Sequence, residues 1–474
     1  MLGGYLMLME NIGVEPTRLE GQSTAFCRPL SVPDQTLLYR YSIAELQAAY
    51  GRGALSPRDV IDQYLLRIEQ LNKDLNVFVD LDFDGIEQAL EASEARFAED
   101  AQRPLDGIPI AVTADLAVKG LAHTAGMAAR EDLLAHSDCD VVAGLRAAGA
   151  IILGTVNIDE AAFGEDTNNP FTGRSLNPHD VTKSSGGIAG GAAAAVAADL
   201  CVAVISADRM GSVRASAAYC GVFASMPTAH QVSAVGIWPH SPRFDSIGLL
   251  CRSMEDISFL TNVLIAPDLA SAMRRSRYLK LERAGGVTCS REVMAVFDGA
   301  AKCLPEFPVE LSLPHTCLDV AIHLHLLQGR ELAAQLVALG GERCALISDA
   351  LSYCMEPILA CDPAVFEACE GILTETVSAL RQQIASNGIL MVPTVAETAP
   401  LVLQEPDGRL PGSAFPLLAN IAGMPSVQLP IGRDAGGMPI GLCLIGPVGG
   451  DAMVIAQARM LSDQIRGYAP PYLA

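Results

Sequence analysis

The sequence predicts an α/β protein in which helices cover both faces of a large mixed, mostly parallel sheet. Between residues 107 and 265, short apolar runs alternate with segments of helical periodicity, a pattern typical of strands joined by crossover helices. Half of the 474 residues are hydrophobic and 18% are charged, so a large buried core is expected. The sequence shows no internal repeat and no low-complexity tail, and we expect one large domain over residues 1–474.

The first elements, over residues 42–100, are predicted to be helical. Ser56 is a helix-capping residue, Pro57 suits a first helical turn and Asp59 supplies an early acid. Apolar residues follow at helical spacing, namely Val60, Ile61, Tyr64, Leu65, Ile68 and Leu71. A second helix is predicted over residues 84–98, and both helices are expected to cover the core.

The following segment supplies the predicted sheet. Strands are expected over residues 108–112 and 150–156, with a helix over residues 141–147 between them. A last helix is predicted near residues 451–464. These elements account for the expected alternation of strands and helices.

Residues 186–207 form the longest stretch of low charge, with Asp199 as their only charged residue. A membrane span needs larger apolar side chains and flanking anchors than this stretch offers. Its glycine pairs and alanine run favour a tightly packed interior helix, followed by a buried strand over residues 201–206.

The charge balance argues against a nucleic acid or an anionic membrane as a partner. Thirty-two basic residues against 54 acidic ones give a formal net charge of −22, which repels polyanions. The densest basic run, within residues 274–280, is interpreted as a solvated linker face.

The cysteines and the N-terminal run indicate a cytoplasmic protein without a metal or another cofactor. Thirteen cysteines occur without a CxxC pair or metal-ligand spacing, and free thiols in a reducing compartment explain them better than disulfides. Residues 1–13 have neither a basic region nor a cleavage-like end, so they do not resemble a signal peptide.

Five motifs in one order resemble the amidase signature family. They are GIPIAV at 107–112, GGIAGG at 186–191, GSVR at 211–214, NIAGMP at 420–425 and MPIGL at 438–442. Members of that family read GIPVAV, GGSSGG, GSIR, NxAGxP and LPIGL at these places, and they cleave carboxamides with a Ser–Ser–Lys triad. The resemblance covers most of the chain and implies the amidase-signature fold.

The same resemblance divides the expected single domain into four parts. An N-terminal helical layer occupies residues 1–100 and the signature core occupies residues 101–265. A variable substrate-region insert follows over residues 266–388, where the motifs fade, and residues 389–474 return to the core.

The resemblance places the nucleophile at Ser212 but leaves both of its activating groups missing. In the family, a neutral lysine takes a proton from a relay serine, which takes one from the nucleophile. The lysine position falls on Thr113, which is no base near neutral pH, and the relay position falls on Ile188, which has no proton to relay. An alcohol without an adjacent base is a weak nucleophile, and losing one triad member costs about four to six orders of magnitude in turnover.

The oxyanion region is altered as well. Small residues before the nucleophile normally let backbone N–H groups approach the developing negative charge. Here the turn reads Arg209-Met210-Gly211. The side chains of Arg209 and Met210 are expected to fill the place that a substrate needs.

Neither of the two possible replacements for the missing groups fits the sequence well. Taking Ser184 and Ser185 as the relay serines requires a four-residue deletion before them and a compensating insertion after them. Lys119 and Lys183, the nearest lysines, match a non-catalytic lysine and a loop arginine of the family pattern. We therefore keep Ile188 and Thr113 as the aligned residues.

Two further groups of residues could suggest catalysis or metal binding, but a structural role is the simpler interpretation for both. Asp159 and Glu160 are interpreted as acids at a helix start. His315, His323 and His325 include an HxH pair, which suggests a metal. Positions two apart on a helix point in different directions, so structural histidines are the favoured interpretation.

Together these residues favour a pseudo-amidase that acts as a binding, structural or regulatory subunit. Its expected partners are another protein or a second copy of the chain, and a small amide-like ligand in the pocket at the nucleophile position. The alternative is an active amidase or acyltransferase in which another group activates Ser212. Asp115, Asp208 and a histidine of the variable region are the candidate bases for that alternative.

Overall fold

The computed structural model describes residues 37–239, 241–265, 267, 276–402 and 413–473. The strands of its main sheet, in chain order, are β1 (Phe78–Leu81), β2 (Pro109–Thr113), β3 (Ile151–Val156), β6 (Ala203–Asp208), β7 (Phe223–Met226), β8 (Ser246–Cys251), β9 (Arg277–Leu281), β10 (Val309–Leu311), β11 (Gly388–Pro393), β12 (Ser426–Arg433) and β13 (Pro439–Ile445). A separate small hairpin consists of β4 (Asn168–Asn169) and β5 (Gly173–Arg174). The N-terminal run 1–13 and Arg274 and Arg275 of the basic run lie outside the described residues.

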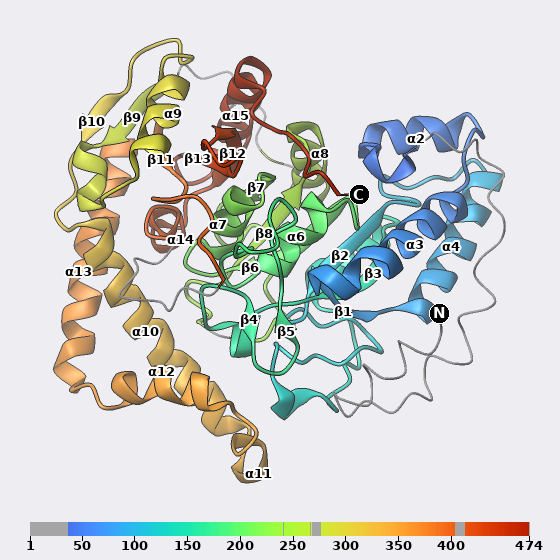
Figure 1. Cartoon of the computed structure of the whole chain (residues 1–474), viewed down its shortest axis with the longest axis horizontal. Coiled ribbons are helices and arrows are strands. Elements are labelled where there is room, and N and C mark those ends of the chain that lie inside the picture. The colour runs from blue at the N-terminus through green and yellow to red at the C-terminus, as the bar shows by residue number, and fades with distance from the viewer. Residues whose placement is uncertain (1–36, 240, 266, 268–275, 403–412, 474) are drawn as a thin grey trace.

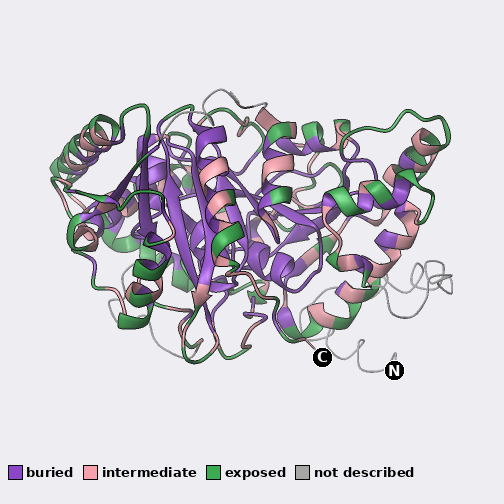
Figure 2. Cartoon of the chain, turned by 90° about the horizontal axis from the view of Figure 1, so that it is seen from above, coloured by how far each residue is buried: buried purple, intermediate pink, exposed green. Residues whose placement is uncertain are grey.

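The helices flank this sheet (Figure 1). In chain order they are α2 (Ile43–Gly51), α3 (Pro57–Leu75), α4 (Phe83–Ala98), α5 (Asp140–Ala147), α6 (Gly190–Ala197), α7 (Ser212–Tyr219), α8 (Met254–Ile265), α9 (Arg291–Ala301), α10 (Cys317–Ala338), α11 (Gly341–Cys344), α12 (Asp349–Leu359), α13 (Pro363–Ile384), α14 (Leu417–Ala422) and α15 (Asp451–Ile465). Figure 2 shows the buried strands in the interior and helices with exposed outer sides around them. Among the described residues, no helix combines the length and apolar character that a bilayer crossing requires.

The predicted large mixed sheet with helices on both faces is confirmed, but its parallel ladders are restricted to two regions. The strand order is β1-β3-β2-β6-β8-β7-β12-β13-β11-β9-β10. Pairing is parallel from β3 to β6 and from β11 to β10, and antiparallel elsewhere. Helix α7 does carry the chain from β6 to β7 as a crossover, but β8 lies between them and is antiparallel to both. The alternation of elements predicted the crossover and missed the inserted strand.

The N-terminal helical layer follows its sequence signals closely. Ser56 caps α3 and forms a capping box with Asp59, and Pro57 occupies the first turn. The second predicted helix is α4. The expectation of helix throughout residues 42–100 is wrong at β1, where Phe78–Leu81 pairs with β3.

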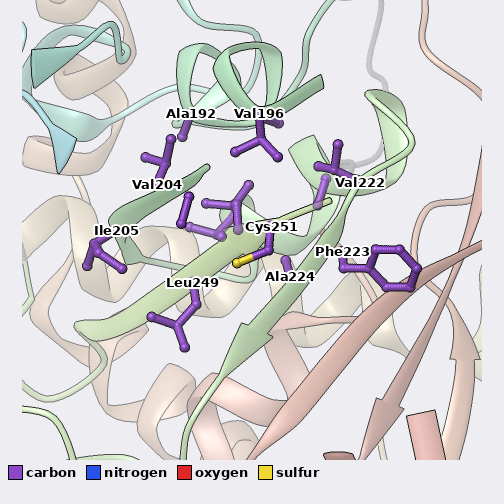
Figure 3. Packing of buried hydrophobic residues seen from close by; sticks show 14 of the residues in the cluster. Ala192, Val196, Val204, Ile205, Val222, Phe223, Ala224, Leu249 and Cys251 are labelled. Atoms are coloured by element: carbon purple, nitrogen blue, oxygen red, sulfur yellow. The ribbon is translucent and has the colours of Figure 1, made fainter. Parts of the chain in front are cut away.

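The glycine and alanine segment forms the interior helix that its composition predicted. All eight residues of α6 are buried, and β6, which follows it, is buried along its length. Figure 3 shows Ala192 and Val196 of α6 close to Val204 of β6. Small side chains allow this close approach of helix and sheet, and the position of Ser212 after β6 is thereby fixed.

The variable region adds a group of helices at one side of the sheet (Figure 1). Helix α10 packs against α12 and α13, and α13 also contacts β11. A second buried apolar cluster joins these helices to the loops before α7. The division of the single domain into four parts stays a prediction.

Candidate functional site

Ser212, the predicted nucleophile, is the first residue of α7 and follows a tight turn. Met210 and Gly211 both have left-handed backbone conformations, with φ of 54° and 81°. A Cβ atom at Gly211 would lie 2.7 Å from Pro416 Cβ, so only glycine fits there. The turn begins at Arg209, whose carbonyl accepts a hydrogen bond from the Ser212 N–H at 3.0 Å.

The Ser212 hydroxyl is buried at the start of α7. The residue is 3% exposed, and among the described residues no group forms a hydrogen bond with its Oγ atom. Leaving a buried polar group unpaired costs about 1–3 kcal/mol. Such a group in a native fold is typical of a functional site.

A pocket lies at this hydroxyl. Apolar side chains and glycines supply part of its lining, and residues with hydroxyl, imidazole, guanidinium and carboxylate groups supply the rest. The lining residues are Phe163, Gly164, Glu165, Gly187, Ile188, Arg209, Met210, Ser212, Ala215, His325 and Ser413. The structure therefore brings Ile188, Arg209 and Met210 to Ser212, as the sequence predicted.

The loop that carries Ile188 is held by Thr167. The Thr167 hydroxyl donates to the Gly187 carbonyl at 2.8 Å and accepts from the Gly190 N–H at 2.6 Å. The Ile188 carbonyl accepts from the Asp159 N–H at 3.0 Å. This network fixes the backbone of the loop, and the aliphatic Ile188 side chain lies in the pocket.

Ser184 and Ser185 have other partners. The Ser184 hydroxyl donates to Asp166, and the Ser185 hydroxyl donates to the Ser175 carbonyl at 2.9 Å. Neither serine belongs to the pocket lining among the described residues. The assignment of the relay position to Ile188 stays a prediction.

Thr113 is not brought into the pocket. It ends β2 and is fully buried, and its hydroxyl donates to Ser206 Oγ of the neighbouring strand β6 at 3.3 Å. Ser206 in turn donates to the Ala207 carbonyl at 3.2 Å. The threonine thus serves contacts between strands.

Arg209 lines the pocket, and its guanidinium is bound by acidic side chains and a backbone carbonyl. Its guanidinium forms ion pairs with Asp115 and with Asp245, the latter at 2.9 Å, and donates to the Trp238 carbonyl at 2.7 Å. Arg209 is fully buried. Burial by itself lowers the pKa of the guanidinium, but the charges of Asp245 and Asp115 outweigh it and keep Arg209 charged.

Two of the three candidate bases are therefore held in ion pairs. Asp115 pairs with Arg209. Asp208 pairs with Arg214 at 2.8 Å, and both side chains are fully buried. Each of these carboxylates is therefore bound to a buried guanidinium.

His325 is the histidine of the variable region that reaches the pocket. Its ring stacks on Phe163 with 4.6 Å between centroids, and burial lowers its pKa, so it is neutral near pH 7. His315 instead pairs with Glu375 at 2.8 Å, and His323 Nδ1 contacts the Asp319 carbonyl at 2.5 Å. Among the described residues no cluster of histidine, cysteine or acidic side chains is arranged to hold a metal.

Asp159 and Glu160 have roles that the sequence did not predict. Asp159 precedes the short 3-10 helix η4 (Glu160–Ala162) and Glu160 begins it, but the Asp159 side chain forms no capping hydrogen bond with this helix. Its carboxylate accepts the N–H groups of Asp166 at 3.2 Å and Asn168 at 2.9 Å, and burial raises its pKa to about 7. Glu160 accepts from the N–H and the hydroxyl of Ser348, before α12.

Sequence reasoning missed Phe163, His325 and Ser413 as pocket residues. Phe163 and Ser413 carry no chemical signal of their own. A histidine of the variable region was a candidate base for Ser212, but the sequence did not single out His325, because more than one hundred residues separate it from Ser212.

Comparisons with known proteins agree with this architecture. Residues 59–283 match the family model Amidase. A glutamyl-tRNA(Gln) amidotransferase subunit of Thermus thermophilus is 37% identical over 224 residues, which cover 47% of this chain and 46% of that relative. The corresponding subunit of Desulforapulum autotrophicum is 28% identical over 461 residues, covering 86% of this chain and 94% of the relative.

Solved structures share the fold over nearly the whole chain. The crystal structure of an amidase has a TM-score of 0.82 at 25% identity and covers 90% of this chain and 100% of its own. A protein of a vestigial complex, linked to the evolutionary origins of an s-triazine catabolic enzyme, has a TM-score of 0.84 at 23% identity. It covers 91% of this chain and 100% of its own.

Proposed function

Because the chain belongs to the amidase signature family, we propose that it binds a small amide-like ligand in the Ser212 pocket without hydrolysing it. One observation carries this proposal. Among the described residues, no group forms a hydrogen bond with Ser212 Oγ, and its neighbour in the pocket, Ile188, is aliphatic.

The chemistry of the nucleophile explains why binding and hydrolysis separate here. A serine hydroxyl attacks a carbonyl only when a base removes its proton. Thr113 is hydrogen-bonded to Ser206 and is no base near neutral pH. Without the relay, turnover falls by about four to six orders of magnitude, whereas the Ser212 hydroxyl can still exchange hydrogen bonds with a ligand.

The relatives support a role inside an assembly. Several of them are named as subunits of an amidotransferase. We infer that this chain likewise works with a protein partner or a second copy of itself, in a binding or regulatory role. Native mass measurement of the purified protein, with and without its co-purifying chains, tests this part of the proposal.

Labelling with a serine-directed fluorophosphonate tests the loss of hydrolysis. We expect the wild-type protein to be labelled no faster than Ser212→Ala, because the unactivated hydroxyl does not attack phosphorus. Prompt labelling of the wild-type protein that is absent in Ser212→Ala contradicts the proposal.

Restoring the missing groups tests whether their absence alone explains the proposed loss of hydrolysis. Thr113→Lys combined with Ile188→Ser and Met210→Gly replaces the missing base, relay and small residue. We expect this variant to gain fluorophosphonate labelling at Ser212. The same variant carrying Ser212→Ala is the control, and labelling that persists in it comes from another residue.

The position of His325 supports a second candidate, an amidase with a rewired base. Ser212 and the neutral His325 line one pocket. In this mechanism His325 takes the Ser212 proton as Oγ bonds to the substrate carbonyl carbon, and then gives that proton to the leaving amine as the C–N bond breaks. Water then releases the acid from Ser212, with His325 accepting and returning the proton.

The two candidates separate through a pair of histidine variants. If the second mechanism operates, His325→Ala abolishes labelling of Ser212 and His323→Ala does not, because His323 is bound to the backbone of its own helix. If neither the wild-type protein nor His323→Ala is labelled, the rewired mechanism is wrong.

A further inference from the structure

The arm of helices built by the variable region exposes large apolar side chains. In Figure 1, α10 runs from the side of β9 and β10 down to α11, and α12 packs against α10. Within residues 337–365, five large apolar side chains are more than a third exposed, namely Val337, Leu346, Tyr353, Leu359 and Val365. Exposed apolar side chains gathered on one part of a surface mark an interaction site.

The outer face of α12 is centred on Tyr353. Leu351, Met355 and Ile358 are buried on the inner face, which packs against α10. Successive helical residues turn by about 100°, so Tyr353 points away from these three side chains, and it is 78% exposed. Tyrosine is enriched in protein interfaces, because it combines a large apolar ring with a polar hydroxyl.

Two carboxylates flank Tyr353 on the same face of the helix. Asp349 precedes it by four residues and Glu356 follows it by three, and both are exposed. Residues at these spacings are neighbours on a helix surface. The outer face of α12, defined by Asp349, Tyr353, Glu356 and Ala360, therefore presents an aromatic ring between two acids.

The charges around α12 leave this face negative. Residues 341–375 include seven acidic residues and one basic residue, Arg343. The cation of the neighbouring helix α10, Arg330, lies over the ring of Phe366 in α13. The ion pairs of the segment are Arg343 with Asp132, Glu370 with Arg243 and Glu375 with His315. Five of its carboxylates thus have no counter-charge among the described residues, and they attract a cationic partner.

A second copy of the chain does not suit this face. A two-fold dimer brings the same patch of both copies together, so the acids of α12 would face the same acids. A basic amphipathic helix of another protein fits instead, because its apolar stripe covers Tyr353 and Leu359 while its cations pair with Asp349 and Glu356. The eleven residues of α12 span about 16 Å, or about three turns of such a helix.

The inner side of α12 lies behind the Ser212 pocket. Ser348, which caps α12, donates to Glu160. A Cβ atom at Gly329 of α10 would lie 2.4 Å from Ile358 Cδ1 and 3.4 Å from Phe163 Cζ, and Phe163 lines the pocket. A partner on the outer face therefore binds a helix that packs close to the pocket wall, which suits a regulatory role.

We propose that the outer face of α12 is the docking surface for a basic amphipathic helix of a different protein. This inference rests on the proposed role inside an assembly, and it names the surface and the kind of partner. Tyr353 is the apolar anchor, and Asp349 and Glu356 select the cationic side chains.

Fluorescence anisotropy of a labelled peptide with the full chain tests the proposal. The probe is a helical peptide of leucine and lysine in amphipathic order, and the comparison peptide has glutamate in place of lysine. We expect the wild-type protein to bind the lysine peptide and not the glutamate peptide. Tyr353→Ala should weaken binding of the lysine peptide by about tenfold or more. Asp349→Asn combined with Glu356→Gln should weaken it as well and reduce its dependence on salt.

Helix α4 provides a matched control with the same spacing of acids. Asp84, Gln88 and Glu91 are exposed on α4 at the intervals of Asp349, Tyr353 and Glu356, with glutamine in place of the aromatic ring. Gln88→Ala, and Asp84→Asn combined with Glu91→Gln, should leave peptide binding unchanged. Because all the substituted side chains are exposed, every variant should keep the unfolding temperature of the wild-type protein.

Three results overturn the proposal: the wild-type protein does not bind the lysine peptide, the α12 variants bind it as the wild-type protein does, or the α4 variants lose as much affinity. A native mass measurement that shows a dimer dissociated by Tyr353→Ala also overturns it, since a second copy then covers α12. An assembly that the α12 variants leave intact keeps the proposed subunit role and moves its interface elsewhere. Prompt fluorophosphonate labelling of Ser212 refutes the non-hydrolytic function and leaves the peptide result valid.

Discussion

At the scale of single residues, several non-glycine residues around the Ser212 pocket have a left-handed backbone conformation. Ala161 and Ala162 have φ of 55°, Thr167 has 44° and Met210 has 54°, all in the left-handed region. Each such residue costs about 1–3 kcal/mol unless the surroundings support it. These residues flank Phe163, the Ile188 loop and Ser212. The backbone that frames the pocket is therefore held in sterically demanding conformations by its surroundings.

Asp159 gives this frame a pH dependence. Burial raises its pKa from 3.8 to about 7, so the folded protein binds this proton more tightly than the unfolded chain does. Its contribution to the free energy of unfolding is then greatest below pH 4 and is lost as the pH rises to about 7. We expect Asp159→Asn to lack this decline, which amounts to about 4 kcal/mol at most. Urea unfolding of both proteins at pH 5 and pH 8 measures it.

Asp180 is a control for the sign of this effect. Hydrogen bonds from Thr182 lower the pKa of its carboxyl group, so its contribution is present at neutral pH and is lost in acid. Asp180→Asn should therefore lose stability relative to the wild-type protein as the pH rises. If Asp159→Asn shows the same trend as Asp180→Asn, the raised pKa of Asp159 is wrong.

Whether a pocket residue could be predicted from the sequence depended on its separation from Ser212 along the chain. Ser212 and Ile188 follow from spacing within one short segment, and the structure places both at the pocket. His325 reaches the same pocket through the packing of α10, more than one hundred residues away. No local pattern distinguishes such residues from ordinary members of a helix.

At the scale of elements, α12 is attached to the core through its own N-terminus. The Ser348 hydroxyl accepts from the Leu351 N–H at 3.1 Å and donates to Glu160, which is 6% exposed. Ser348→Ala therefore removes a helix cap and also leaves a buried carboxylate with fewer partners. We expect a loss of about 2–3 kcal/mol in the free energy of unfolding.

Ser290→Ala separates the two contributions to this loss. Ser290 caps α9 by accepting from the Val293 N–H at 3.2 Å, and its hydroxyl does not bind a buried carboxylate of the described chain. Its replacement should therefore cost about 1 kcal/mol. Urea unfolding of both variants measures the difference. Equal losses would mean that the Glu160 contact contributes nothing to the attachment of α12.

The elements themselves were largely predictable because their signals are local. The Ser56 cap, the helical spacing that follows it and the low charge of α6 each act within a few turns of chain. Strand β1 was missed because four residues between two helices carry little periodicity. Its place is determined by pairing with β3, which is a contact between distant segments.

At the scale of the whole molecule, Arg214 joins segments that are about two hundred residues apart. It pairs with Asp208 at the end of β6, donates to the Pro416 carbonyl at 2.6 Å and to Ser426 Oγ of β12 at 2.9 Å, and reaches Asn420 of α14 at 2.5 Å. These long-range bonds connect the glycine-rich core with the C-terminal part of the sheet. The sequence predicted both parts from separate motifs but did not show how they are connected.

Arg214→Met is therefore expected to destabilise the entire fold. It leaves the fully buried Asp208 carboxylate without its counter-charge, and breaking such a pair costs about 3–5 kcal/mol. Adding Asp208→Asn removes the unpaired charge, so the double variant should lose less stability than Arg214→Met alone.

Arg243→Met is the matched control. Its pair with Glu370 is about half exposed, and its loss should cost less than about 1 kcal/mol. Urea unfolding monitored by tryptophan fluorescence and by circular dichroism should show one transition for each variant. Equal losses for Arg214→Met and Arg243→Met would show that the Arg214 network does not hold the two halves of the core together.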